Sequence, residues 1–295
     1  MPAQTQLPRR TLEELVAIHS VERDIHDVIV EGPSDQNIVE WFLSENGRTN
    51  CAVYEVGLFQ VDPHDVLSLG LEDNNRGRVI SVADTIDKRC GQNSRVTCVA
   101  DRDFDEVLET EHNYRSLLIT DYACMLMYTF NRKVLSKYIR FRLRGFKKSA
   151  NQVIREISEA LQILFAVRLA KHVLRLGLKT VKWQDCCSLQ GAGVELDTGE
   201  YLDRYVDKNS QRRSRDQIAT QIQECRRWMT FDPRLQIKGH DFIAILIWYI
   251  SQHPGFGAFA RRTDETVESE LFSCLEIRDL AIEGLFQDLL ERVVA

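Results

Sequence analysis

The sequence lacks the residue spacings with which cysteine and histidine usually hold zinc. Its eight cysteines form no Cys-x-x-Cys pair, no His-x-x-x-His accompanies them, and the adjacent Cys186 and Cys187 do not match a zinc spacing. The first fifteen residues also lack the apolar core of a signal peptide. We therefore expect reduced, mostly buried thiols and a cytoplasmic protein.

Long apolar runs and nucleotide-binding loops are missing as well. The most apolar window, "DFIAILIWYI" at 241–250, is only half as long as the roughly 20 residues needed to span a bilayer. We expect a buried helix there and no membrane association. The chain has no Gly-x-x-x-x-Gly-Lys-Ser/Thr loop, so any ATP hydrolysis that the biology requires must come from another subunit.

What is present is an ordinary globular composition. Of the 295 residues, 44% are hydrophobic and 28% are charged, which fits one large domain or two of ordinary size. The net charge of −6 argues mildly against a general nucleic-acid binder.

The first half of the chain alternates strand and helix patterns. Strands are predicted near 25–30, 51–57, 95–101 and 114–121, and helices over 11–20, 35–46 and 74–91. Thr11 and Glu14 form a capping-box pattern at the first helix. This order predicts an α/β fold, with a parallel sheet flanked by helices.

The second half is predicted to be mostly helical. Helical patterns cover 121–143, 149–177, 215–229, 239–253 and the stretch from about 265 to the end, and 186–201 is rich in turn residues. We therefore predict an α/β domain at 1–147 and a helical C-terminal domain at 148–295.

Acidic residues follow two of the predicted strands. Glu31 ends the strand of "VIVEGPSD", and Asp101, Asp103 and Asp105 follow the strand of "VADRDFD". Residues two apart in an extended segment face the same way, and ligands of parallel sheets bind at the carboxyl ends of the strands. Clustered carboxylates repel unless a positive charge joins them, and Mg²⁺ or Mn²⁺ suits oxygen ligands and phosphodiester cleavage. The alternative is that these acids cap helices, as we favour for Asp35.

These two motifs resemble the Toprim domain, in which one strand ends in Glu-Gly and a later strand ends in Asp-x-Asp. The forms "EGPSD" and "DRDFD" are most similar to the nuclease branch related to the OLD (overcoming lysogenisation defect) proteins. Together with "IKGHDFIAIL" at 237–246, they most resemble the Toprim effector subunit of PARIS-type anti-phage defence systems. The Toprim resemblance covers about residues 25–125.

The resemblance implies roles for particular residues. Glu31 would be a metal ligand or general acid/base, and Asp101 and Asp103 would be the metal-holding pair. Gly32 would allow a tight turn and close approach of a phosphate. His240 and Asp241 would be accessory residues, although we favour Asp241 as the cap of the helix that follows. The sequence departs from the pattern at Met125, where relatives often carry an acid, and Asp121 is the candidate substitute.

The function implied is that of a metal-dependent endonuclease in abortive infection, cleaving RNA such as tRNA. It would work beside an ABC-type ATPase subunit, and as a homodimer when active. Two alternatives stay open: a catalytically weak Toprim subunit that an ATPase binds or that regulates it, and a DNA nickase.

One tract of the chain lacks acidic residues altogether. No Asp or Glu occurs from residue 122 to residue 155, whereas basic side chains are frequent and Tyr138, Phe141 and Phe146 are interleaved. Such a tract suits phosphate contact and base stacking, or docking on an acidic partner. The alternative is a solvated helix face with aromatic core residues. The predicted nucleic-acid contacts are Arg132, Lys133, Lys137, Arg140, Arg142, Arg144, Lys147 and Lys148.

Overall fold

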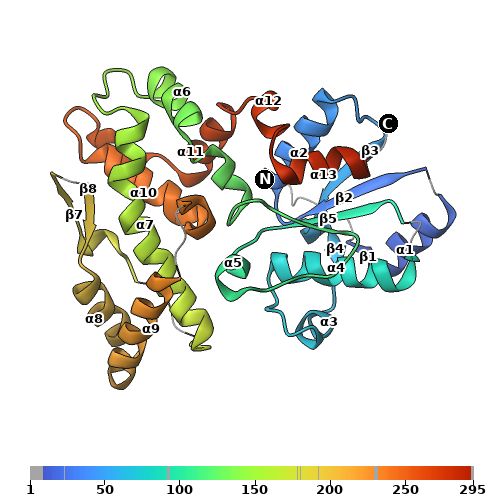
Figure 1. Cartoon of the computed structure of the whole chain (residues 1–295), viewed down its shortest axis with the longest axis horizontal. Coiled ribbons are helices and arrows are strands. Elements are labelled where there is room, and N and C mark those ends of the chain that lie inside the picture. The colour runs from blue at the N-terminus through green and yellow to red at the C-terminus, as the bar shows by residue number, and fades with distance from the viewer. Residues whose placement is uncertain are drawn as a thin grey trace, which may run out of the picture. The chain divides into compact units, whose positions relative to one another are not determined.

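The computed structural model describes residues 9–22, 24–91, 94–177, 179, 181–191, 193–228 and 232–293. The chain divides into two compact units (Figure 1). The first unit comprises 1–101, 111–121 and 276–295, and the second comprises 102–110 and 122–275.

A four-stranded parallel sheet forms the centre of the first unit. Its strand order is β3-β2-β5-β6, with every neighbouring pair parallel. The predicted α/β class and all four predicted strands are confirmed, although each strand is shorter than its sequence pattern. Their bounds are β2 His26–Val30, β3 Cys51–Glu55, β5 Val96–Ala100 and β6 Leu117–Ile119.

Helices cover both faces of this sheet (Figure 1). Helices α1 (Leu12–Val21) and α4 (Asn75–Arg89) pack on one face, and α2 (Pro33–Glu45) and α13 (Gly284–Arg292) lie on the other. Because both faces are covered, β2 and β5 are buried along their whole length, as expected for central strands of a parallel sheet. The predicted capping box of α1 is present.

Helix α13 comes from the far end of the chain. Phe286 packs against Phe42 of α2 with ring centroids 4.7 Å apart, and the Arg292 guanidinium donates to the Leu117 carbonyl oxygen of β6. The main-chain N–H of Leu285 donates to both carboxylate oxygens of Asp121, at 3.0 and 3.3 Å. A Cβ at Gly284 would lie 2.7 Å from Asp121 Oδ1, so a larger residue there would displace this carboxylate.

Some short elements of the first unit escaped the sequence prediction. Strands β1 (Arg10–Thr11) and β4 (Phe59–Gln60) pair in parallel, and a 3₁₀ turn (Val56–Leu58) precedes β4. Helix α3 (Pro63–Ser68) has Asp62 as its N-cap. Elements this short carry too few residues for a clear periodic pattern.

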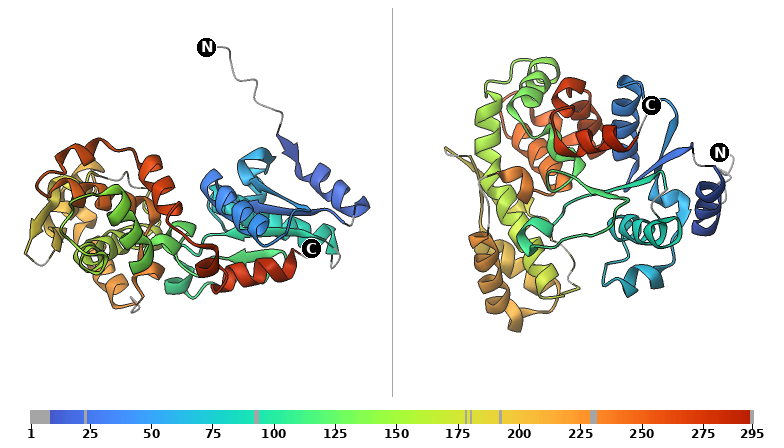
Figure 2. Two further views of the ribbon diagram at one scale, coloured as in Figure 1. Left: turned by 90° about the horizontal axis from the view of Figure 1, so that it is seen from above. Right: turned by 45° about the vertical axis from the view of Figure 1, so that its right-hand side comes forward.

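The second unit is mostly helical, as predicted, and is arranged around the long helix α7 (Figure 2). Its longer helices are α6 Arg132–Arg142, α7 Ala150–Val173, α8 Thr198–Lys208, α9 Arg215–Arg227, α10 Gly239–Ser251 and α11 Asp264–Phe272. The shorter α5 (Asp105–Leu108) belongs to this unit, and α12 (Ile277–Leu280) to the first.

One sequence prediction in this region is wrong, and one short element was missed. The single helix expected over 121–143 is instead a 3₁₀ segment, Met125–Thr129, followed by α6. Asn131 separates them, because its side chain accepts from the N–H groups of Lys133 and Val134 and so caps α6. The turn-rich patch at 186–201 contains an antiparallel hairpin, β7 (Cys187–Gln190) and β8 (Gly193–Leu196).

The predicted division at residues 147 and 148 stays a prediction, because compact units in one conformation do not establish which segments fold alone. Across the described ranges, none of the helices is long and apolar enough to cross a membrane.

Candidate active site

Glu31 and Asp101 meet at the carboxyl ends of two adjacent strands of the first unit. Glu31 directly follows β2 and Asp101 directly follows β5, and these two strands pair in parallel. The main-chain N–H of Asp101 donates to Glu31 Oε1 at 2.7 Å. Two acids that are seventy residues apart in sequence are therefore brought into direct contact, as the strand pattern predicted.

The N-terminus of α4 braces both acidic strand ends, which sequence reasoning missed. The Asn75 side-chain amide donates to the Glu31 carbonyl oxygen at 2.9 Å. Arg76 Nε donates to the Asp101 carbonyl oxygen at 2.7 Å. In a parallel sheet, the helix that follows a strand begins near the carboxyl ends of the strands. The letters "NNR" at 74–76, where the helix was predicted to start, could therefore have indicated polar side chains near the two acids.

His112 joins the same group through Arg76. Its Nε2 lies 3.2 Å from a terminal guanidinium nitrogen of Arg76. Because a guanidinium only donates hydrogen bonds, Nε2 must accept, which places the proton of the neutral imidazole on Nδ1. Arg76 thus sets the tautomer of a histidine that the sequence alone did not single out.

Asp103 belongs to the second unit, in which Lys238 binds its carboxylate. The Asp103 backbone is left-handed, with φ +52°, and its N–H donates to the Ala123 carbonyl oxygen at 2.9 Å. Aspartate tolerates this conformation better than most residues do. The turn explains why Asp101 and Asp103 do not follow the simple extended geometry assumed from the sequence.

Lys238 is a second residue that sequence reasoning missed. Its ammonium lies 4.3 Å from the centroid of the Phe104 ring, and Phe104 packs edge-on against Phe165 of α7. Lys238 is the residue immediately before the "GHD" of the quoted motif. The motif therefore indicated that this segment matters for the site, but its lysine was overlooked.

Gly32 does not have the conformational role predicted for it. Its φ of −150° and ψ of 174° describe extended backbone that any residue adopts, and an added Cβ would come no closer than 3.8 Å to Asp35. The tight-turn explanation is wrong, whereas the close approach of a phosphate stays a prediction. Asp35 accepts from the Gly32 N–H at 3.1 Å and so caps α2, as favoured from the sequence.

The remaining acids of the motifs have structural contacts. Asp105 is buried as the first residue of α5, and its carbonyl oxygen accepts from the Thr110 N–H. Asp121 caps α13 through the N–H of Leu285. Met125 is only 2% exposed, as expected for a residue that packs in the core.

The prediction that Asp241 caps the apolar helix is wrong. Lys238 is the N-cap of α10, and Asp241 instead accepts two bonds from the Arg168 guanidinium of α7, both 2.6 Å long. Asp241 is buried because this bidentate pair satisfies its charge. His240 beside it is exposed.

The basic tract divides into core residues and surface residues. Tyr138 is fully buried, and Phe146 packs against Tyr249, His253 and Phe256. For these two aromatics, the alternative that they are core residues is correct. Lys137 donates to the Cys274 carbonyl oxygen, whereas the exposed positions are Arg132, Lys133, Arg140, Phe141, Arg142, Arg144 and Lys147.

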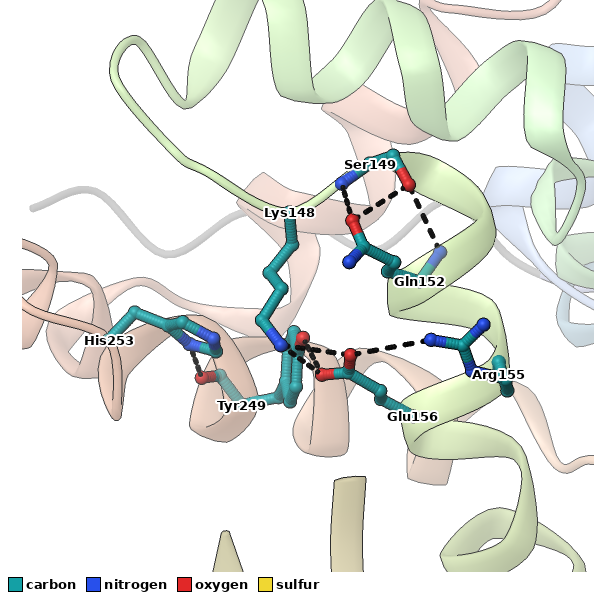
Figure 3. Close-up of polar contacts among 7 residues, drawn as sticks. All are labelled: Lys148, Ser149, Gln152, Arg155, Glu156, Tyr249 and His253. Carbon is teal, nitrogen blue, oxygen red and sulfur yellow. Dashed lines mark hydrogen bonds and ion pairs between the residues drawn. The ribbon is translucent and has the colours of Figure 1, made fainter. Parts of the chain in front are cut away.

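Lys148 points into the second unit, toward Glu156 (Figure 3). Its ammonium lies 2.9 Å from both carboxylate oxygens, and the Tyr249 hydroxyl donates to Glu156 at 2.7 Å. Burial raises the pKa of Glu156, but the hydrogen bonds from Lys148 and Tyr249 outweigh it and hold that pKa below its ordinary value. Lys148 is thus engaged with a buried carboxylate and is a weaker candidate for nucleic acid.

The first unit offers ligands that fit a hard divalent cation. In the described part of the chain, no three His, Cys, Asp or Glu side chains are grouped so as to hold a metal ion. Mg²⁺, however, usually binds through one or two carboxylates plus substrate phosphate and water. Glu31 and Asp101 supply two such carboxylates at one sheet edge.

Comparison with known proteins finds no family model that matches this sequence and no curated protein that matches it.

Proposed function

We propose that this protein is a Toprim-type, metal-dependent endonuclease that acts as an effector of anti-phage defence. The single observation that supports this best is the contact between Glu31 and Asp101 at the ends of β2 and β5. It joins the two acidic motifs on which the Toprim resemblance depends.

Within this proposal, Glu31 and Asp101 would hold Mg²⁺ or Mn²⁺, and Asp103 would complete the motif. The bound ion would supply positive charge that stabilises the phosphoryl oxygens during cleavage. Arg76, already fixed on the Asp101 carbonyl oxygen, would add a guanidinium that suits phosphate. His112, with its proton on Nδ1, would be a hydrogen-bond donor at this edge.

The proposed substrate is RNA, with tRNA as the leading candidate. The proposed partners are an ABC-type ATPase subunit and a second copy of the chain in the active state. All of this follows from the resemblance, together with the absence of a phosphate loop of the Walker type.

The sharpest test separates charge from structure at Glu31. Glu31→Gln keeps an oxygen that accepts from the Asp101 N–H but loses the negative charge. We expect this variant and Asp101→Asn to retain the wild-type melting temperature and to lose Mg²⁺-dependent cleavage of tRNA by at least about 100-fold, which corresponds to about 2.7 kcal/mol of transition-state stabilisation.

Matched controls are the exposed acids Glu224→Gln and Asp216→Asn, which should leave cleavage unchanged. The assay compares EDTA with Mg²⁺ on tRNA and supercoiled DNA, using both the free chain and the chain co-expressed with the ATPase. Cleavage that persists in Glu31→Gln and Asp101→Asn would remove these residues from the active site, and nicking of DNA alone would favour the nickase.

A second candidate function is a catalytically weak subunit that regulates, or is bound by, the ATPase. Two observations favour it: Lys238 neutralises the Asp103 carboxylate, and buried Met125 stands where relatives often have an acid. This candidate predicts stable association with the ATPase and no cleavage in any state, including the co-expressed one.

A further inference from the structure

Phe141 stands out on the surface of the second unit. It lies in the last turn of α6, and 72% of it is exposed, although burying such a ring normally stabilises a protein by about 1.5–3 kcal/mol. The buried residues of the same helix are Val134, Leu135 and Tyr138. Phe141 follows Val134 by seven positions and Tyr138 by three, so it continues their stripe, yet at the end of the helix its side chain stays largely exposed.

Several basic residues lie close to Phe141 in sequence. Arg140 and Arg142 are its neighbours in sequence, and Arg144 and Lys147 follow in the exposed turn before α7. Figure 2 shows α6 and this turn at the margin of the second unit. Basic residues at a helix C-terminus interact favourably with the helix dipole. This accounts for Arg140 and Arg142 but gives no reason for an exposed aromatic ring.

Some of these cations have partners and others remain available. Helix α11 packs against α6, and its Glu270 lies 3.7 Å from Arg142 and also pairs with Arg262. Across the described ranges, no carboxylate pairs with Arg140, Arg144 or Lys147. Of the cations near Phe141 in sequence, Arg142 is thus paired with a carboxylate, whereas the charges of Arg140, Arg144 and Lys147 are not compensated in this way.

We infer that the exposed C-terminal end of α6 and the turn after it bind an unpaired nucleic-acid strand. Phe141 stacks on a base, while Arg140 and Arg144 contact phosphates. An aromatic ring with flanking cations is the arrangement that recognises single strands, because the bases of a duplex are already stacked and inaccessible. This inference rests on the proposed function, since it takes the strand to be the substrate of the candidate active site.

The test measures binding without cleavage, by fluorescence anisotropy with Glu31→Gln protein in EDTA. The probes are an unstructured RNA, a DNA of the same sequence, and the corresponding duplexes. Loss of one stacked base predicts that Phe141→Ala weakens single-strand binding about 5- to 140-fold, that Phe141→Trp retains it, and that duplex binding does not respond. The two single-strand arms distinguish RNA from DNA.

Charge is tested separately. Arg140→Glu with Arg144→Glu should reduce the salt slope for single strands by about 1.4, because each phosphate contact on a single strand contributes about 0.7. The matched control reverses two exposed arginines elsewhere in the second unit, Arg213→Glu with Arg227→Glu, and should leave the slope unchanged. Circular dichroism should show that every variant is folded.

The outcomes are distinct. Equal binding of single strands by wild type and Phe141→Ala overturns this inference, even if tRNA is cleaved. The inference is also overturned if the control double variant lowers the salt slope as much as Arg140→Glu with Arg144→Glu does. Binding of polyglutamate in place of nucleic acid would likewise overturn it and would indicate an acidic protein partner. Phe141-dependent binding by a protein that never cleaves supports the binding site and sinks only the proposed nuclease activity.

Discussion

At the scale of single residues, the main-chain N–H of Asp101 ties one acidic motif to the other. The bond to Glu31 gives the glutamate a structural role beside any chemical one. An alanine at position 31 would remove both roles at once, whereas glutamine removes only the charge. The conservative variant is therefore the informative one.

His26 is a buried histidine of the first unit. This residue begins β2 and is 4% exposed, close to the buried pair of His19 Nε2 and Asp27 Oδ2, which are 2.9 Å apart. Burial, together with the smaller effects of the charges of Arg95 and His19, lowers the pKa of His26 to about 4, and the charge of Asp27 opposes this shift. At neutral pH this imidazole stays uncharged.

The resulting prediction concerns stability against pH. Because the unfolded chain titrates near pH 6.5, it binds more protons than the folded chain between pH 6.5 and 4. The contribution of His26 to the free energy of unfolding is therefore full above about pH 6.5 and falls by about 3 kcal/mol as the pH drops to 4. Urea unfolding of wild type and His26→Leu across this range checks it. Parallel curves for the two proteins would contradict the assignment.

At the scale of elements, two polar contacts to buried carboxylates join α7 and α10. Glu156 accepts from Tyr249, and twelve residues later along α7 Arg168 binds Asp241. Since residue numbers rise along α7 while they fall along α10, the two helices run antiparallel. The pairs thus fix both the direction and the register of α10 on α7.

Breaking one of these contacts should be costly. Arg168→Met leaves the buried Asp241 carboxylate without its cation, so we expect the free energy of unfolding to fall by about 3–5 kcal/mol. Arg168→Met with Asp241→Leu removes both charges and should recover most of that loss. Denaturant titrations of the two variants measure this. A double variant no more stable than the single one would mean that the pair is not coupled as the geometry indicates.

At the scale of the whole molecule, the chain does not complete its first unit until its last residues. The segment 276–295 belongs to the same compact unit as 1–101, so α13 packs beside α2 only after the second unit has been traversed. Side chains of α13 that are almost fully buried are Leu285, Phe286 and Leu289.

Removal of 284–295 should therefore destabilise the first unit. Losing the burial of these three apolar side chains corresponds to a fall in the free energy of unfolding on the order of 5 kcal/mol. Asp121 also loses the hydrogen bond from the Leu285 N–H. We expect a lower melting temperature and binding of a hydrophobic dye. The milder Phe286→Ala should lose about 3–5 kcal/mol, whereas Ile282→Ala, at a side chain 75% exposed, should be close to wild type. Wild-type stability of the truncated chain would show that α13 does not complete this unit.

Local patterns sufficed for the parts of the fold that depend on neighbours in sequence. Strand runs such as Val28–Val30, the cap formed by Thr11 and Glu14, and the acids at two strand ends were all readable, because periodicity and capping act over a few residues. The hairpin of β7 and β8 was missed because its turn residues masked two four-residue strands.

What only the tertiary structure decided is which distant side chains meet. The structure joins Arg76 to the Asp101 carbonyl oxygen, Lys238 to the Asp103 carboxylate and Arg168 to the Asp241 carboxylate, and no local spacing relates these residues. The two carboxylate pairs form because a charge that is buried or crowded needs a partner, and the fold determines which one is within reach. The sequence by itself determined the sheet and its acidic edge, and tertiary packing determined which of those acids stand beside a cation.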